Sequence, residues 1–294
     1  MLIWGSSWLA IHFQLGEVAP EVSIAYRFIL ASGLLVIWCR LRRISLRIAL
    51  RHHPFLALLG LSLFSLNYLL FYYAAFDLAT GLLAVIFSTM TVMNIFNSAI
   101  FLRRQIQKKT VLAVVFGLTG MALVFWPEIT TSGPRVAAAI GISLIATYLA
   151  SIGNIVSARN QNHGLPVAST NTIGMAYGAL FMLAYSAGSG TPFVIDTSTT
   201  YIGSLLFLAL FASAIAFGCY LTLVGRIGPA NAAYATVLFP IVALALSTWF
   251  EDYEWQNRAL VGVGLILIGN AIVLSRPGLI SRLKALSPRG QNND

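Results

Sequence analysis

Residues 22–51 read VSIAYRFILASGLLVIWCRLRRISLRIALR, an apolar run that ends in a basic segment. Residues 22–39 carry one charged side chain, Arg27, and their length is close to the ~20 residues with which an α-helix crosses a ~30 Å hydrocarbon core. Such a run predicts a membrane span whose C-terminal end lies in the cytoplasm. The arginines that follow the run are Arg40, Arg42, Arg43, Arg47 and Arg51.

The same pattern recurs along the whole chain, so we expect an all-α integral membrane protein with ten transmembrane helices. Most of the apolar segments reach or approach the length of a span, whereas the first, fifth and tenth are shorter. The segments are residues 2–15, 22–39, 55–76, 81–102, 111–126, 136–157, 167–187, 202–223, 230–250 and 259–274.

Charged residues in the breaks between these segments alternate in sign. Fifteen of the 18 Lys and Arg residues lie on one side of this alternation, and eight of the nine Asp and Glu residues lie on the other. Arg135 and Arg258 are basic exceptions on the acidic side. The positive-inside rule therefore predicts a multi-pass protein with both termini in the cytoplasm. The acidic breaks contain Glu17, Glu21, Asp77, Glu128, Asp196, Glu251, Asp252 and Glu254.

Composition excludes most other classes of protein. With 58% hydrophobic and 9% charged residues and a mean hydropathy of +0.83, the chain has too few polar groups to cover a soluble globule. The net charge of +9 does not indicate nucleic-acid binding, because the basic residues lie beside span ends, where anionic lipid attracts them. Cys39 and Cys219 form no CxxC pair. We expect a lipid bilayer and a small-molecule substrate as partners, no nucleic acid, no metal and no cofactor.

The first apolar segment is also the shortest of the ten. It lacks the basic region and the small-residue cleavage site of a secretory signal peptide. Either residues that precede this sequence complete the span, or the bilayer thins locally around a short helix. We expect the former.

An internal repeat organises the segments. Residues 81–126 and 230–275 align without a gap at an offset of 149, and the earlier spans correspond more loosely at an offset of 146, where Trp8 meets Asn154. Each copy holds five spans, and an odd number of crossings inverts the second copy relative to the first. We predict one repeat over residues 1–132, a second over 133–278 and a basic tail over 279–294. Identical pairs include Ala84 and Ala233, Ser98 and Ser247, and Gly120 and Gly269.

Two short motifs and this five-plus-five plan resemble a known family. Trp4-Gly5-Ser6-Ser7-Trp8 and Tyr26-Arg27-Phe28 are similar to motifs of the drug/metabolite transporter superfamily, in its EamA-type branch. Within that branch the sequence most resembles bacterial exporters of aromatic amino acids. The resemblance implies ten helices around a central cavity that opens alternately to the two sides of a bacterial inner membrane, and export of small metabolites.

Depth along the spans selects candidate substrate-binding residues. With a rise of ~1.5 Å per residue, Trp8 comes close to the middle of the core, although Trp prefers the interfaces. A midplane indole must bond a neighbouring carbonyl or face a polar cavity, so Trp8 either packs helices together or stacks on an aromatic substrate. Trp4 of the same motif is a further candidate.

The third segment brings Asn67 and Tyr68 to a similar depth, and Tyr72 lies one turn from Tyr68. Buried amides and phenols in a membrane need partners, which either a substrate or a neighbouring helix supplies. We expect Asn67 to contact the polar end of the substrate and the two tyrosines its apolar part.

The fourth segment is unusually polar and adds Ser88 and Thr91 to the candidates, with helix packing as the alternative role. In the second repeat, Pro240 falls at the position of Thr91. A proline there frees the carbonyl group of Thr236 near the midplane and predicts a hinge or a polar contact.

Arg27 and His12 are the intramembrane side chains able to carry a positive charge. Arg27 could hold a substrate carboxylate by two parallel hydrogen bonds, or bond helix-end carbonyls instead. His12 is a candidate for proton coupling, but the sequence offers it no embedded acidic partner. No Asp or Glu lies at midspan, so we predict facilitated, gradient-driven movement rather than obligatory proton exchange.

The sequence offers little support for an enzyme. His52 and His53 are adjacent in a basic loop and His163 is isolated in another, and no HExxH, GxSxG or Walker-type motif is present. Our interpretation is therefore an exporter of aromatic and large apolar amino acids, with export of other metabolites or drugs as the alternative. The sequence leaves the oligomeric state open, because small packing residues serve contacts within one protomer or between two.

Overall fold

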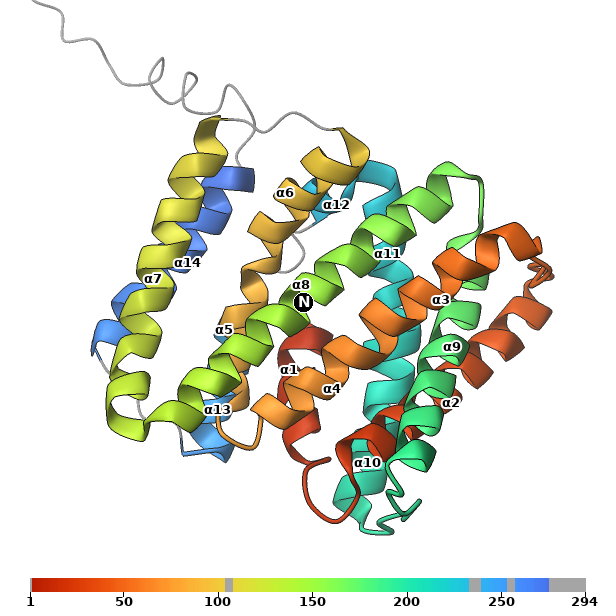
Figure 1. The fold of residues 1–294 in the computed structure, drawn as a ribbon, viewed down its shortest axis with the longest axis horizontal. Coiled ribbons are helices and arrows are strands. Elements are labelled where there is room, and N and C mark those ends of the chain that lie inside the picture. Colours follow the sequence, from red (N-terminus) through yellow and green to blue (C-terminus); the bar gives the residue numbers. More distant parts are fainter. Residues whose placement is uncertain (1, 104–107, 233–238, 253–256, 275–294) are drawn as a thin grey trace, which may run out of the picture.

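The computed structural model describes residues 2–103, 108–232, 239–252 and 257–274, and within these ranges the chain is helical and contains no strand (Figure 1). The predicted basic tail, residues 279–294, lies outside the described residues. In chain order, the α-helices are α1 (Leu2–His12), α2 (Pro20–Leu41), α3 (His53–Leu61), α4 (Asn67–Ala74), α5 (Thr80–Ser88), α6 (Met90–Leu102), α7 (Lys108–Ser132), α8 (Pro134–Asn162), α9 (Val167–Gly188), α10 (Thr199–Phe207), α11 (Ala216–Ile227), α12 (Pro229–Ala232), α13 (Phe239–Phe250) and α14 (Asn257–Leu274).

Six helical stretches of the described chain are long and apolar enough to cross a membrane. Shorter apolar helices occupy Val114–Phe125, Pro240–Phe250 and Asn257–Ile272, and α1 has 11 residues. The all-helical membrane class predicted from the sequence is confirmed, whereas the number of ten spans stays a prediction. The six long stretches are Pro20–Leu41, Leu50–Ala74, Thr80–Leu102, Pro134–Asn162, Val167–Gly188 and Thr199–Ile227.

Helix α8 runs through the middle of the bundle and packs against α3, α4, α5, α6 and α11 (Figure 1). On one side of it α7 packs along α14, and on the other α2 packs along α9. The backbones of α7 and α14 touch, because a Cβ atom added at Gly120 would lie 2.5 Å from the carbonyl oxygen of Gly262. Such close approach is typical of helices that associate in lipid through small residues.

Two of the long stretches are interrupted by π-helices. The segment η2 (Ser62–Leu66) joins α3 to α4, and η3 (Leu208–Ile215) joins α10 to α11. Ser62 plus the repeat offset of 146 is 208, so the two interruptions begin at corresponding positions. In η2, the hydroxyl group of Ser65 donates to the carbonyl oxygens of Gly60, at 3.0 Å, and Leu61, at 2.8 Å. A π-turn interrupts the regular series of backbone hydrogen bonds, and the hydroxyl group of Ser65 offers its carbonyl oxygens a replacement donor.

Buried carboxylates connect helix ends in the predicted outer breaks. Glu251 at the end of α13 accepts hydrogen bonds from the backbone N–H of Thr80, at 2.8 Å, from its hydroxyl group, at 2.6 Å, and from Ser247. The carboxylate thus lies at the positive end of the α5 dipole. At the start of α2, Glu21 accepts bonds from Tyr73, at 3.3 Å, and Thr191, at 2.9 Å. Both acidic residues serve structure at the rim of the bundle.

Candidate functional site

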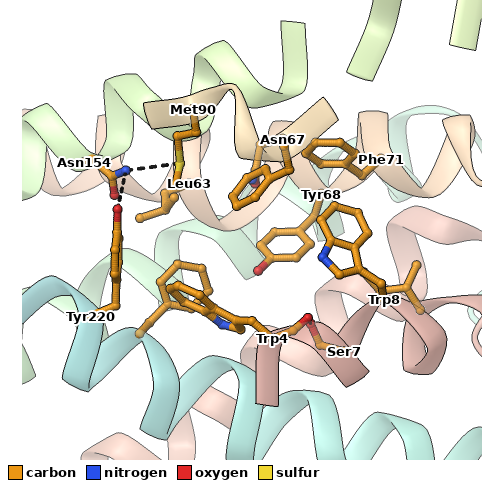
Figure 2. Close-up of a pocket in the computed structure, with 13 residues that line it drawn as sticks. Trp4, Ser7, Trp8, Leu63, Asn67, Tyr68, Phe71, Met90, Asn154 and Tyr220 are labelled. Carbon is orange, nitrogen blue, oxygen red and sulfur yellow. Dashed lines mark hydrogen bonds between the residues drawn. The ribbon is translucent and has the colours of Figure 1, made fainter. Parts of the chain in front are cut away.

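A cavity in the interior of the bundle gathers residues from five regions of the chain: α1, the η2–α4 stretch, α5 and the start of α6, α8, and α11 (Figure 2). Its empty volume, including the opening, is about 540 Å³. The thirteen lining residues are Trp4, Ser7, Trp8, Ile11, Leu63, Asn67, Tyr68, Phe71, Phe87, Met90, Asn154, Phe217 and Tyr220.

Two tryptophans of α1 form one side of this cavity. Trp4 and Trp8 are four residues apart and therefore share a face of the helix. The indole N–H of Trp4 donates to the carbonyl oxygen of Ala212, at 3.1 Å, inside the π-helical segment η3. Both tryptophans line the cavity, and the bond to Ala212 anchors Trp4 to a segment in the second half of the chain.

Aromatic rings from other helices meet these tryptophans edge to face. Trp8 packs on Phe71, with ring centroids 5.0 Å apart, and Trp4 packs on Phe217, at 5.1 Å, and Tyr220, at 4.9 Å. Such pairs add to the free energy of burial and fix the ring orientations. The walls are therefore rigid, apolar surfaces.

The π-turn of η2 is directly followed by the polar residues of the site. Asn67 is the first residue of α4, and Tyr68 follows it, so the wider turn sets the direction in which both side chains leave the helix. Asn67 is 3% exposed, and its side-chain oxygen has no hydrogen-bond partner within the described part of the chain. Figure 2 shows the Tyr68 hydroxyl group directed into the space between Trp4, Tyr220 and Asn67.

Behind Tyr68 lies Arg27, which is buried and does not line the cavity itself. Its Nη2 donates to the Tyr68 hydroxyl at 3.3 Å, its guanidinium carbon lies 4.3 Å from the centre of the tyrosine ring, and its Nε donates to Ser213 at 2.9 Å. No carboxylate of the described residues lies within 4 Å of this cation. Nη1 also lacks a hydrogen-bond partner among them. A buried cation without a counter-charge makes the Tyr68 hydroxyl a good donor toward an anion.

Across the cavity, Asn154 of α8 is the centre of a polar cluster. Its Nδ2 donates to the Tyr220 hydroxyl at 3.2 Å and contacts the sulfur of Met90 at 3.3 Å (Figure 2). The same nitrogen lies 3.4 Å from the side-chain oxygen of Asn94. The side-chain oxygen of Asn154 is buried, with no partner in the ranges that the structure describes. Asn67 and Asn154 therefore contribute two unpaired acceptors, one from each half of the chain.

Four of the residues proposed from the sequence come together here, namely Trp4, Trp8, Asn67 and Tyr68, and Arg27 supports them through Tyr68. Sequence reasoning missed Asn154 and Tyr220 as site residues. The loose alignment of Trp8 with Asn154 was a usable signal, since both residues line the cavity.

The other proposed residues lie away from the cavity lining. Tyr72 is fully buried, and its hydroxyl lacks a partner within the described chain. Ser88 donates to the carbonyl oxygen of Val85, at 2.7 Å, within its own helix. Thr91 is buried in the same helical region.

Pro240 and His12 also lie outside the cavity lining. Pro240 is the second residue of α13 and is buried, whereas Thr236, whose carbonyl group it was expected to free, lies outside the described residues. His12 has an acidic partner that the sequence did not reveal, because its Nδ1 lies 3.4 Å from Glu251 and 42% of its side-chain surface is exposed. Long-range packing of α1 against α13 brings the two together.

The chain belongs to the EamA-like transporter family, which matches residues 1–126 and 137–275. It is therefore a multi-pass membrane transporter that acts on small molecules. Among the described residues, no group of three or more His, Cys, Asp or Glu side chains is placed to hold a metal ion.

Curated relatives cover nearly the full length at low identity. Protein PagO of Salmonella typhimurium is 22% identical over 273 residues, which cover 93% of this chain and 90% of PagO. A probable amino-acid metabolite efflux pump of Escherichia coli is 22% identical over 280 residues, which cover 92% of this chain and 90% of the pump.

A solved crystal structure has the same fold. It superposes with a TM-score of 0.72 over 92% of this chain and 93% of its own, at 14% sequence identity. At this identity the similarity extends to the fold alone.

Proposed function

We propose that this transporter exports amino acids with aromatic or large apolar side chains by alternating access around the cavity. The observation that carries the proposal is the composition of that cavity: seven of its thirteen lining residues are aromatic, and its few polar groups are unpaired amide oxygens and a phenol backed by a cation. The name of the Escherichia coli relative, a probable amino-acid metabolite efflux pump, supports the substrate class.

The aromatic rings account for the apolar part of the substrate. Trp4, Trp8, Phe71, Phe217 and Tyr220 all line the cavity, so an apolar substrate side chain there meets aromatic rings on several sides. Offset and edge-to-face contacts with such rings contribute about 0.5–1.5 kcal/mol each beyond area burial. A charged side chain would find no counter-charge among the thirteen described lining residues.

The polar groups account for the two charged ends of an amino acid. The side-chain oxygens of Asn67 and Asn154 are acceptors without donors, which suits a substrate ammonium group. The Tyr68 hydroxyl accepts a bond from Arg27, so its own proton remains available to a substrate carboxylate. The substrate thus supplies both charges that the cavity lacks.

The two-fold plan supports alternating access. The family matches residues 1–126 and 137–275, which agrees with the repeats proposed over residues 1–132 and 133–278. The π-helices η2 and η3 begin 146 residues apart, at corresponding positions of the two proposed repeats. Phe71 and Phe217 are separated by the same 146 residues. In inverted-repeat transporters, one helix group rocks against the other around a central site. We infer that α3–α4 and α10–α11 are the elements that move.

The transport cycle proposed here needs no proton. None of the thirteen described lining residues is acidic, and the buried carboxylates of Glu21 and Glu251 bind helix ends at the rim. A cavity without a titrating carboxylate is suited to facilitated movement down the substrate gradient.

Counterflow tests the function directly. Proteoliposomes preloaded with aromatic, aliphatic or charged amino acids, without an ion gradient, are exposed to the radiolabelled amino acid outside. We expect saturable exchange with aromatic and large apolar amino acids and none with charged ones. Exchange that requires an imposed pH gradient would contradict the facilitated cycle, and no exchange with any amino acid would contradict the substrate class.

A matched pair of tryptophan variants locates the site. Trp8→Leu removes a cavity wall, whereas Trp249→Leu changes a tryptophan that is 77% exposed on α13. We expect Trp8→Leu to raise KM for aromatic amino acids at least about tenfold, the equivalent of 1.4 kcal/mol, and Trp249→Leu to leave it unchanged. Equal KM values in both variants would remove Trp8 from the site. Monodisperse elution in detergent controls for folding.

A further inference from the structure

A second hollow lies on the flank of the bundle, outside the cavity. It is bounded by α2, α9 and the η3–α11 stretch, and with about 1140 Å³ of empty space, its opening included, it is more than twice as large. Its lining is almost entirely apolar, and we call it the lateral groove. The residues that line it are Leu34, Leu35, Trp38, Val167, Ala168, Asn171, Leu210, Ala214, Ile215, Gly218, Cys219 and Thr222.

Both helical walls of the lateral groove lead to an arginine at the same end. Arg42 directly follows the last residue of α2, four residues after Trp38, and its guanidinium carbon is 4.7 Å from the centre of the tryptophan ring. On α11, Arg226 lies one turn beyond Thr222 and shares its face of the helix. Both arginines are exposed. The groove is thus apolar along its length and basic at one mouth.

The floor contains a polar group that the protein leaves unsatisfied. Asn171 of α9 is fully buried, and neither its side-chain oxygen nor its nitrogen has a hydrogen-bond partner within the described residues. Leaving a buried amide unpaired is unfavourable, so a ligand that supplies a donor or acceptor here binds more tightly. Val167 and Ala168, one turn earlier on α9, place this amide near the basic mouth.

The geometry points to a binding site for one anionic phospholipid from the leaflet that faces the basic loops. The acyl chains lie along the apolar walls of α2 and α11, ester oxygens reach the Asn171 amide, and the headgroup phosphate lies between Arg42 and Arg226. The charge of the mouth matches an anionic headgroup, which polybasic span ends attract. Apolar walls with an amide near the headgroup level suit a lipid better than a free phosphate, which would leave the groove empty. This inference does not rest on the proposed function.

The site borders a wall of the cavity. Cys219 and Ile215 line the lateral groove, while Phe217 and Tyr220 on the neighbouring faces of the same stretch line the cavity. A lipid in the groove therefore contacts the helix that presents Phe217 and Tyr220 to the cavity.

Native mass spectrometry of the full chain, released from detergent with added lipid, tests the site. The probes are phosphatidylglycerol and phosphatidylcholine with identical acyl chains. We expect one retained phosphatidylglycerol at concentrations about tenfold lower than phosphatidylcholine, because two arginines attract the anionic headgroup. Arg42→Gln with Arg226→Gln should abolish this preference. Arg47→Gln with Arg51→Gln is the matched control, which removes the same charge from the basic break and should preserve the preference.

A second pair of variants tests the apolar part. A Cβ atom added at Gly218 meets no described heavy atom within 4 Å, so Gly218→Leu fills the groove without disturbing the fold, and Gly203→Leu is the control in equally open space on α10. We expect Gly218→Leu to lower retention of both lipids several-fold and Gly203→Leu to leave it unchanged. Equal retention of the two lipids by the unmodified protein, or no effect of Gly218→Leu, would overturn the proposal. An equal effect of the two arginine pairs would likewise overturn it.

Discussion

The two π-interrupted stretches, Leu50–Ala74 and Thr199–Ile227, use the same local design in different surroundings. Each carries a π-turn at a corresponding position, and each presents an aromatic ring to one tryptophan of α1: Phe71 to Trp8 and Phe217 to Trp4. Helix α1 therefore lies between two similar walls. The correspondence is local, because it depends on the backbone and on a few side chains.

The surroundings of the two stretches differ. In the most apolar 18 residues of the first stretch 61% are buried, and the stretch packs closely on α8 and α9, where Gly60 leaves room for only a hydrogen atom against Gly174 and Gly178. In the corresponding 18 residues of the second stretch 44% are buried, and the stretch has open space at Gly203 and Gly218 and borders the lateral groove. A backbone irregularity thus fixes where side chains leave the helix, while neighbouring helices decide how freely the helix can shift.

The largest expected contrast is between glycines of the two stretches. A Cβ atom added at Gly60 would lie 2.6 Å from the carbonyl oxygen of Gly174 and 2.8 Å from the backbone nitrogen of Gly178, so α3 and α9 would have to separate. We expect Gly60→Leu to cost more than about 3 kcal/mol and to abolish a monodisperse elution peak. Gly203→Leu should elute as the unmodified protein does. Equal yields of the two variants would show that the stretches are packed alike.

The serines of the two π-turns should differ next. Ser213 in η3 accepts the bond from Nε of buried Arg27, whereas Ser65 in η2 donates only to carbonyl oxygens of its own helix. We expect Ser213→Ala to cost about 1.5–3 kcal/mol and Ser65→Ala about 1 kcal/mol, measured as shifts of the melting temperature in detergent. A larger shift for Ser65→Ala would mean that the π-turn itself, and not the arginine, sets the stability.

The two phenols of the cavity provide a functional contrast. Tyr68→Phe removes the acceptor of a charged donor and the proposed contact to the substrate carboxylate, whereas Tyr220→Phe removes a neutral bond to Asn154. We expect KM for an aromatic amino acid to rise about tenfold in Tyr68→Phe and about threefold in Tyr220→Phe. Counterflow at varied substrate concentration measures both values. The reverse order would assign the carboxylate to the Asn154 side.

The smallest expected effect concerns Phe71 and Phe217, and it tests most directly whether the two π-interrupted stretches are equivalent. Each Phe→Leu change removes an edge-to-face contact with one tryptophan, a loss of about 0.5–1.5 kcal/mol. We expect similar decreases in melting temperature and a change of tryptophan fluorescence in both variants. If one variant loses transport and the other retains it, the substrate contacts only one of the two walls.

The rotation of each helix about its axis was the feature that the sequence could not supply. Spans that are apolar nearly all round have no strong periodicity, so the inward face of α4 or α11 cannot be read from spacing. Tyr68 and Tyr72 illustrate this: they are one turn apart and share a face in projection, yet Tyr68 lines the cavity and Tyr72 is buried between helices. The π-turn before Asn67 also rotates the whole of α4 relative to α3, so the inward face of α4 does not follow from the residues that precede it.

Contacts distant in sequence were equally hidden. The pairing of His12 with Glu251 joins residues near opposite ends of the chain, and Arg27 bonds Ser213, which lies 186 residues later in the sequence. Asn154 looked like one polar residue among many in its segment, and only the convergence of α1, α8 and α11 brings it to the cavity.

The sequence alone determined the class of protein, because the lengths of the apolar runs and the alternation of charge depend only on the thickness and electrostatics of the bilayer. It also marked Trp4, Trp8, Asn67 and Tyr68, since polar or interfacial residues at midspan are unusual wherever the helix points. The tertiary structure decided which of these residues converge, which helix flank stays open to lipid, and where buried charges find partners. Those properties arise from packing between helices far apart in the chain. The apolar sequence of a single helix does not specify that packing, because lipid and a neighbouring helix solvate an apolar face equally well.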